Sequence, residues 1–333
     1  MVNRDIVAIG TSAGGFEALL FLAKGFPQNF PATILITIHL PLQFRSSLDL
    51  LLTEAGPLPA TFAEEGEIKK KSRIYIAPPG HHLIVDGEQL WLGTGPRENN
   101  ARPAIDPMLR SVAVCCGNRG IGVVLTGTLG DGASGLWAVN QTGGITVVQD
   151  PKDAAFPEMP RTALKRMQPD HVVHLRDMPG LLYTLVHRAA GDPIVVPDNL
   201  RYEVEIARNG HASMQGMDWF GARSVLTCPD CGGIMWQLKD GDLSRYRCHI
   251  GHAYTEELIT VGLDERLKRA MVTALRALNE RIALATKLRD EEEAKGRPDL
   301  AKSWSLRADE LEREAGVIRD AISRLDRTQQ AEF

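Results

Sequence analysis

The chain has 333 residues, of which 44% are hydrophobic, and its formal net charge is −4. This length allows about two domains with a sizeable core, and the composition is that of an ordinary globular protein. The slightly acidic balance argues against a nucleic-acid-binding protein, and no apolar run approaches the roughly 20 residues that span a bilayer, so we expect no membrane insertion.

The N-terminus and the cysteines indicate a cellular compartment. The first residues lead straight into a strand pattern and lack the layout of a signal peptide. The five cysteines fit no secreted disulfide framework, because Cys115 and Cys116 are adjacent and the other three cluster late in the chain. We therefore expect a cytoplasmic protein with reduced thiols.

Up to about residue 190, short β-branched runs alternate with amphipathic helical stretches. The predicted strands lie at 6–10, 32–39, 121–126 and 145–149, and the predicted helices at 15–24, 45–53, 106–116, 133–141 and 178–190. Short apolar runs at 73–77, 82–85 and 89–92, broken by turn residues, predict an antiparallel hairpin insertion. The alternation predicts an α/β fold with a doubly wound, mostly parallel sheet covered on both faces.

The pattern changes after Ala190. We predict a partly packed linker at 191–226, with a short alternating run at 202–206, and a compact zinc-ribbon-like segment at 227–254. Residues 255–333 are helical with a break at Gly296, which predicts a helical hairpin. The predicted division is therefore an α/β domain at 1–190, a linker, a small ribbon and a helical tail.

The first predicted strand ends in a turn with the pattern Gly10-x-Ser12-x-Gly14. This pattern is typical of a nucleophile elbow, where a sharp strand-to-helix turn exposes the serine Oγ beside the N–H groups of a helix N-terminus. A dinucleotide-binding turn would need glycine where Ser12 stands and an acidic residue where His39 ends the second strand. Both departures favour a hydrolase.

Two further residues complete a catalytic pattern. His39 stands at the carboxyl end of the second strand, and Asp131 lies in a glycine-rich turn after the strand at 121–126. Open α/β sheets collect their active residues at this edge, so a Ser12–His39–Asp131 triad is predicted. A role of Asp131 as helix N-cap is compatible with this. The chain order Ser, His, Asp disfavours the α/β-hydrolase superfamily.

Residues 4 to about 190 resemble the catalytic domain of the CheB-type protein-glutamate methylesterases of bacterial chemotaxis. The resemblance rests on six ordered blocks, at 9–15, 38–41, 75–78, 102–106, 124–132 and 159–161. It implies Ser12 as nucleophile, His39 as general base and Asp131 as the acid that orients it. It also implies hydrolysis of glutamate methyl esters on chemoreceptors, often with deamidation of glutamines. The match starts at once, so we expect no phospho-receiver domain ahead of it.

The expected partner is a methyl-accepting chemotaxis receptor or a similar signalling protein, and no cofactor is expected for the chemistry. We expect Arg102, Arg161 and His82 to line the cleft and hold an acidic, helical substrate, although surface or structural roles explain them equally well. Two alternatives stay open, a non-enzymatic signalling scaffold and a small-molecule carboxylesterase. Because every matched block precedes Ala190, we expect residues 1–190 to be an active esterase alone.

The late cysteines form a metal-ligand pattern. Cys228-x2-Cys231, a predicted hairpin, and Cys248-x3-His252 together predict a four-ligand structural zinc site of the ribbon or knuckle type. His252 is preferred to His249, because a residue adjacent to Cys248 reaches the same ion with difficulty. Four protein ligands leave no open position for catalysis. The alternative is a set of free thiols in a reduced protein.

Overall fold

The computed structural model describes residues 2–40, 46–210, 212–241 and 243–331. It divides into two compact units, Met1–Leu258 and Ile259–Phe333. Within the described ranges, no helix is both long enough and apolar enough to cross a membrane. Pro41, in one of the matched blocks, and Arg45, where a helix was expected to begin, lie outside the described residues.

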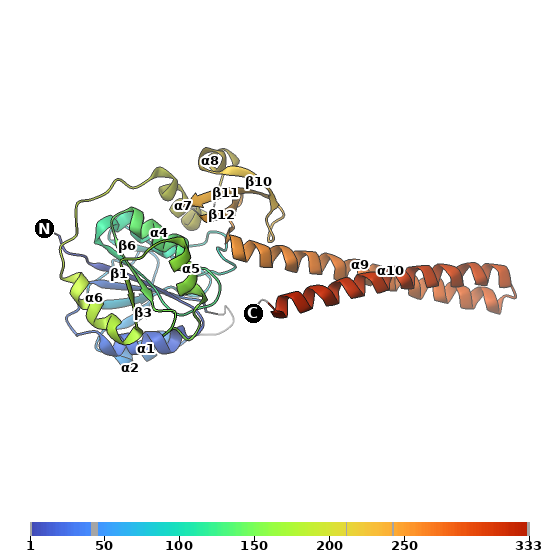
Figure 1. The fold of residues 1–333 in the computed structure, drawn as a ribbon, viewed down its shortest axis with the longest axis horizontal. Helices are drawn as coiled ribbons and strands as arrows, with labels where there is room; N and C mark the ends of the chain where they lie inside the picture. Colours follow the sequence, from blue (N-terminus) through green and yellow to red (C-terminus); the bar gives the residue numbers. More distant parts are fainter. Residues whose placement is uncertain (1, 41–45, 211, 242, 332–333) are drawn as a thin grey trace. The chain divides into compact units, whose positions relative to one another are not determined.

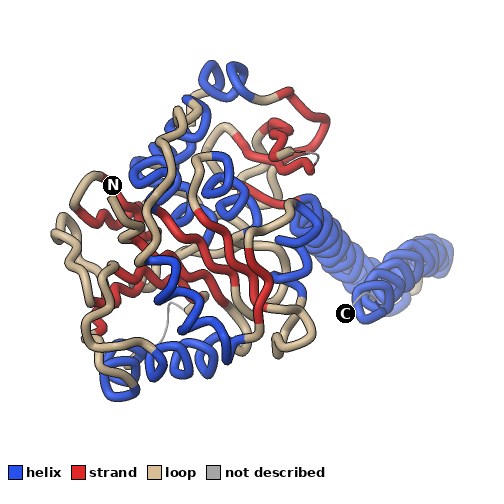
Figure 2. Tube along the Cα trace, turned by 60° about the vertical axis from the view of Figure 1, so that its left-hand side comes forward, coloured by secondary structure: helices blue, strands red, loops and turns tan. Residues whose placement is uncertain are grey.

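The first unit is built on a seven-stranded parallel sheet (Figures 1 and 2). The strand order is β3-β4-β2-β1-β7-β8-β9. The strands are β1 (Ile6–Thr11), β2 (Thr33–Ile38), β3 (Ala60–Phe62), β4 (Arg73–Ile76), β7 (Gly120–Val124), β8 (Ile145–Gln149) and β9 (His171–Val173). The predicted α/β fold class is therefore confirmed.

The predicted hairpin insertion is smaller than expected. Only β5 (His82–Asp86) and β6 (Gln89–Gly93) pair antiparallel to each other. The run that precedes them, β4, lies in the main sheet between β2 and β3, parallel to both. Its buried residues Ile74–Ile76 suit a strand covered on both faces.

Alternate residues of the central strand enter two different cores. Val7 and Ile9 of β1 pack with α1 (Gly15–Gly25), α2 (Leu48–Ala55) and α6 (Met178–Val186). Ile6 and Ala8 face the other side. The elements of that side are α3 (Ile105–Cys116), α4 (Ala133–Gln141), α5 (Glu158–Arg166) and the β5–β6 hairpin. Burial on both faces explains why β1 is apolar throughout.

The direction of the strand order reverses at β1. The chain runs from β1 to β2 on one side, and β7 pairs with β1 on the other. Such a switch point is where open α/β sheets place their ligand sites, outside the carboxyl ends of the strands. The residues that follow β1, β2 and β7 therefore meet at one place.

Residues 191–226 are more regular than the predicted linker. They contain α7 (Asp198–Asn209), α8 (Met214–Phe220) and most of β10 (Ala222–Thr227). The run at 202–206 is helical, and the buried residues of α7 include Leu200, Glu203 and Ile206, spaced three apart. A five-residue alternation fits a helix as well as a strand, which explains the difference.

The rest of the first unit is a second, antiparallel sheet. Its order is β10-β11-β12-β13, with β11 at Ile234–Asp240, β12 at Leu243–Cys248 and β13 at Ala253–Thr255. Helix α9 (Glu256–Ala294) follows directly, and α10 (Pro298–Ala331) is the second helix of the predicted hairpin. The predicted zinc-ribbon-like sheet and the helical tail are therefore both present.

A buried cluster of charged side chains joins this second sheet to the α/β layers. Arg247 on β12 donates to Glu98 and to Glu203 of α7, each at 2.9 Å. Arg245 also donates to Glu203, at 2.6 Å between Nη1 and Oε2, and Arg110 of α3 donates to Glu98. All five side chains are buried. Each charge is paired, which is what burial of ionised groups requires.

A second group of buried contacts lies at the turn between β11 and β12. The carboxylate of Asp240 on β11 accepts from Arg166 of α5 at 2.8 Å and from the hydroxyl of Ser134 of α4 at 2.5 Å. Arg245 donates to the same oxygen at 2.8 Å. Buried ionic contacts therefore fasten the second sheet to α5 and α7, and a buried hydrogen bond fastens it to α4.

The Glu203→Gln variant should destabilise the first unit by about 3–5 kcal/mol, because it leaves buried arginines without their counter-charge. Burial alone would raise the pKa of Glu203, but the charges of Arg245, Arg110 and Arg247 outweigh burial and lower it. A lowered pKa means that the stabilisation is complete above about pH 4.5 and is lost as pH falls. The difference in free energy of unfolding between wild type and variant should therefore become smaller at acidic pH.

Urea unfolding at pH 7 and pH 3.5 measures this difference. The matched control is Glu205→Gln, an exposed position of the same helix, which should stay within about 0.5 kcal/mol of wild type. Equal stability of the two variants at pH 7 would contradict the role assigned to the charge cluster.

Candidate active site

Ser12 lies in the turn between β1 and α1. The turn needs small residues, because Gly14 has a φ of 72° and a Cβ on Gly15 would lie 2.3 Å from the Thr11 side chain. The amide of Ser12 donates to the carbonyl of Thr126 at 3.1 Å, which ties the turn to the loop after β7. The serine is partly exposed, as an elbow nucleophile must be.

His39 connects Ser12 to Asp131. It follows β2 directly, and its Nδ1 lies 3.0 Å from Ser12 Oγ while its Nε2 lies 2.8 Å from Asp131 Oδ2. If Nε2 carries the ring proton and donates it to Asp131, Nδ1 is left as an acceptor for the serine hydroxyl. The structure thus brings the three residues predicted as a triad into one hydrogen-bonded chain.

Asp131 is a buried carboxylate surrounded by donors. Burial alone would raise its pKa, but the hydrogen bonds from His39, Ile105 and Asn99 and the charge on His39 outweigh burial and lower it. Besides His39, its donors are the amides of Ile105 (2.6 Å), Asp106 (3.2 Å) and Gly132 (3.0 Å) and the side-chain amide of Asn99 (2.9 Å). The ionised form that orients His39 is therefore favoured.

The N-cap role considered for Asp131 is not seen. Helix α4 begins at Ala133, its N-cap residue is Gly132, and no side chain caps it from that position. The carboxylate of Asp106 instead accepts a hydrogen bond from the amide of Gly135 in the first turn of α4, at 2.7 Å. Asp106 lies at the start of α3. Burial and the nearby charge of Asp131 raise its pKa to about 7.

Asn99 was not predicted and occupies a central place. Its side-chain amide donates to Asp131 and to Asp106, each at 2.9 Å, so it bridges the two buried carboxylates. Asn99 and Asn100 both have positive φ, 51° and 62°, a conformation that asparagine tolerates better than most residues. The adjacent asparagines were the available signal, because such pairs favour tight turns.

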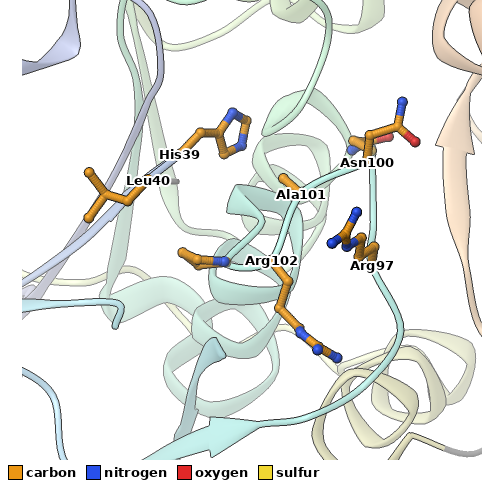
Figure 3. Close-up of a pocket in the computed structure, with 8 residues that line it drawn as sticks. His39, Leu40, Arg97, Asn100, Ala101 and Arg102 are labelled. Atoms are coloured by element: carbon orange, nitrogen blue, oxygen red, sulfur yellow. The ribbon is translucent and has the colours of Figure 1, made fainter. Parts of the chain in front are cut away.

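An open pocket of about 400 Å³ lies beside His39. Figure 3 shows Arg97 and Asn100 across this pocket from Leu40. The lining residues are His39, Leu40, Arg97, Asn99, Asn100, Ala101, Arg102 and Pro103. One wall of the pocket is therefore the segment 97–103, the same segment that contributes Asn99 to Asp131.

The three residues expected to hold the substrate have different positions. Arg102 lines the pocket, and its Nη1 donates to the carbonyls of Thr94 and Gly95 at 3.0 and 2.8 Å. Arg161 is exposed on α5 and is not among the residues that line this pocket.

His82, expected in the cleft, is fully buried. Its Nε2 lies 3.0 Å from the carbonyl of Pro96, and its Nδ1 accepts from the amide of Ala104 at 3.2 Å. Burial lowers its pKa, so the neutral ring is favoured. Both nitrogens are used within the protein, and His82 holds the pocket segment instead of a substrate.

The four predicted metal ligands also come together. The Sγ atoms of Cys228, Cys231 and Cys248 and a ring nitrogen of His252 all lie within 4.8 Å of one another, and His249 is not in the group. The Sγ atoms of Cys231 and Cys248 are 3.7 Å apart. Tetrahedral coordination with Zn–S bonds of about 2.3 Å gives an S–S separation of about 3.8 Å. The donor set and its spacing therefore fit zinc.

Comparison with known proteins assigns the α/β domain. The model of the CheB methylesterase family matches residues 7–182, more than half of the chain. The chain belongs to the CheB methylesterase family. The part that carries the cysteine cluster and the helical hairpin lies beyond the matched residues.

The CheB relatives are similar over the same region. A Pyrococcus abyssi protein described as a protein-glutamate methylesterase/protein-glutamine glutaminase is 35% identical over 192 residues, which cover 56% of this chain and 52% of that protein. A Myxococcus xanthus protein of the same description is 36% identical, covering 54% of this chain and 50% of its own length. The chain thus spans about half the length of these curated relatives.

A solved structure agrees with the assignment. The Thermotoga maritima CheB methylesterase catalytic domain matches with a TM-score of 0.53 and 33% identity, covering 56% of this chain and all of that domain.

Gly127 should be essential for the geometry at Ser12. A Cβ at this position would lie 2.1 Å from Met159 Sδ and 2.9 Å from Ser12 Cβ. Gly127→Ala should therefore slow the reaction of Ser12 with an organophosphonate about 10²-fold, since displacements near 1 Å cost this much. Gly180→Ala on α6 is the control, because its added Cβ meets nothing within 4 Å. Equal labelling of the two folded variants would show that Ser12 tolerates the displacement.

Proposed function

We propose that this CheB-family chain hydrolyses glutamate methyl esters on chemoreceptor-like proteins and deamidates glutamines at such sites. Ser12 is the nucleophile, His39 the general base and Asp131 the acid that orients it. The observation that supports this most strongly is the hydrogen-bonded chain of these three side chains at the sheet's switch point. The names of the matching relatives support the same reaction.

The reaction proceeds in two halves. His39 Nδ1 takes the proton of the Ser12 hydroxyl as Oγ attacks the ester carbonyl, and it then gives that proton to the departing methoxide, which leaves as methanol. His39 next takes a proton from water, the resulting hydroxide attacks the acyl-serine, and the proton returns to Ser12 Oγ as the glutamate side chain is freed as a carboxylic acid, which then loses its proton to water. A glutamine substrate loses ammonia in place of methanol.

Two features lower the barrier of these steps. The first turn of α1 starts three residues after Ser12 and carries N–H groups without intrahelical partners, which suits the negative oxygen of the tetrahedral intermediate. The ionised Asp131 stabilises the imidazolium that forms on His39. No metal or organic cofactor enters this chemistry.

The pocket suits an acidic protein substrate. Arg97 and Arg102 place two cations on the wall that faces His39, and the pocket is open enough to admit a side chain that projects from a receptor helix. An acidic helix of a methyl-accepting receptor would fit this description. A small-molecule carboxylesterase would instead act on free esters without regard to the arginines.

We also infer that Cys228, Cys231, Cys248 and His252 bind one zinc ion with a structural role. The contacts of the knuckle turns support this: the amide of Cys228 bonds to Gly233, and that of Cys248 to His252. Asp230 lies 3.8 Å from the second ring nitrogen of His252, in position to orient the ring. With four protein ligands, the ion keeps no open position and would stabilise the second sheet.

The Ser12→Ala variant should lose methanol release from methylated receptor by a factor on the order of 10⁶, since a triad nucleophile contributes this much. Ser303→Ala, an exposed serine of α10, is the control and should retain full activity. Folding is checked by circular dichroism. Normal turnover by folded Ser12→Ala would exclude the triad. Ser12-dependent cleavage of free esters without any receptor cleavage would favour the carboxylesterase.

The purified chain should contain about one zinc per molecule. The variant Cys231→Ser should lose most of this metal, while Cys115→Ser, outside the cluster, should keep it. Elemental analysis of protein prepared without chelators measures both. Wild-type protein that carries no metal, or equal zinc in the two variants, would contradict the assignment.

A further inference from the structure

Asn99 lies at a junction between the catalytic residues and the metal-binding sheet. On one side, its side-chain amide donates to Asp131, whose other oxygen holds His39. On the other side, its own amide donates to the carbonyl of Ala253 at 2.8 Å, and its Oδ1 accepts from the amide of Thr255 at 3.2 Å. Asn99, Asp131, Ala253 and Thr255 are all buried.

The residues that hold Asn99 follow a metal ligand without interruption. Ala253 is the residue after His252, and Ala253–Thr255 form strand β13. The amide of Cys248 bonds to the carbonyl of His252, so the metal knuckle and the start of β13 are one rigid turn. From His252 to Ser12 the connection runs through Ala253, Asn99, Asp131 and His39, with one hydrogen bond at each step after the peptide bond.

A second connection runs in parallel through charged groups. Arg247, next to the ligand Cys248, donates to the carbonyl of Gly251 inside the knuckle at 2.8 Å. The same guanidinium donates to Glu98, the neighbour of Asn99, at 2.9 Å. Glu98 also forms an isolated parallel bridge with Ala253. The segment 97–99 is therefore fixed to the metal knuckle by backbone and side chain alike.

We propose that the Cys3His metal site controls the catalytic centre through Asn99, which is a positioning residue for Asp131. This inference rests on the proposed function of Ser12, His39 and Asp131. With the metal bound, β13 holds Asn99 so that its amide faces Asp131, and His39 is oriented toward Ser12. Without the metal, the knuckle that anchors β13 loosens, and Asp131 loses a donor on the side opposite His39.

The physical basis is the burial of two carboxylates side by side. Asp131 and Asp106 repel one another, and the amide of Asn99 lies between them as a donor to both. A buried carboxylate that loses such a donor shifts toward its protonated form or turns toward another donor. In either case it holds the imidazole of His39 less well.

The first test replaces Asn99 without touching a metal ligand. Asn99→Ala should slow phosphonylation of Ser12 by an organophosphonate about 10- to 100-fold at unchanged zinc content, in line with the cost of misplaced catalytic groups. Asn29→Ala, an exposed asparagine of the same unit, is the control. Phosphonylation of folded, zinc-containing Asn99→Ala at the wild-type rate would overturn the proposal.

The variant Asn99→Asp separates positioning from general stabilisation. It keeps an acceptor for Thr255 but replaces the donor by a carboxyl that faces Asp131 and Asp106. When this carboxyl is ionised it cannot donate and repels both neighbours, whereas its protonated form donates again. The ratio of variant to wild-type rate should therefore rise as pH falls. A ratio that is flat with pH would show a merely structural role and overturn the proposal.

The second test removes zinc from the full-length chain. Phosphonylation of wild-type Ser12 should slow about tenfold or more, whereas the rate of Asn99→Ala should fall less than twofold further, because both changes break the same connection. If zinc removal slowed the reaction by the same factor in wild type and in Asn99→Ala, the metal would act by a route other than Asn99, and the proposed coupling would be overturned. A wild-type phosphonylation rate that does not respond to zinc removal would overturn it as well.

The hydrogen bond between His39 and Asp131 can also be observed without measuring any reaction, so the coupling can be tested even if the proposed function is wrong. The proton of His39 Nε2 shared with Asp131 should give a low-field resonance in proton NMR of the zinc-loaded chain, assigned by its loss in His39→Gln. Zinc removal and Asn99→Ala should each shift or broaden this resonance. An unchanged resonance overturns the inference, whereas absent Ser12 reactivity with a responsive resonance overturns the proposed function alone.

Discussion

A buried, ionised carboxylate is stable only when hydrogen-bond donors surround it, and the arrangement around Ser12 depends on meeting this requirement at Asp131. Its donors come from elements far apart in the sequence, namely His39 after β2, the start of α3, its own turn and Asn99. They converge only when the sheet, α3 and the pocket segment have assembled. The orientation of His39 toward Ser12 is thus a result of the assembled unit, which a short motif cannot produce alone.

The same constraint explains why the second sheet is not a separate appendage. Glu98 and Glu203 are buried beside Arg110, and they balance their charges with Arg245 and Arg247 from β12. A chain ending at Ala190 would lack Glu203 and both β12 arginines. The compact unit that keeps all of these contacts is Met1–Leu258.

The sequence was most informative where residues follow strands. The proximity of Ser12, His39 and Asp131 could be predicted because parallel strands bring their carboxyl ends to one edge, and the proximity of Cys228, Cys231, Cys248 and His252 because their spacing is specific. The position of Asn99 could not be predicted, since it depends on a left-handed turn and on a hydrogen bond from Thr255, 156 positions later in the chain. Helix α5 was missed because Pro160 in its first turn obscures the helical pattern. His82 was misplaced because a neutral histidine can be buried when both nitrogens find partners.

Amide hydrogen exchange with and without zinc tests the central claim, the proposed coupling between the sheet that carries the Cys3His cluster and the Ser12–His39–Asp131 site. The account predicts that zinc removal from the full chain lowers protection at β12 and β13 and also at the amides of Ile105 and Asp106, which donate to Asp131. Lower protection confined to residues 222–255, with unchanged protection at Ile105 and Asp106, would contradict it.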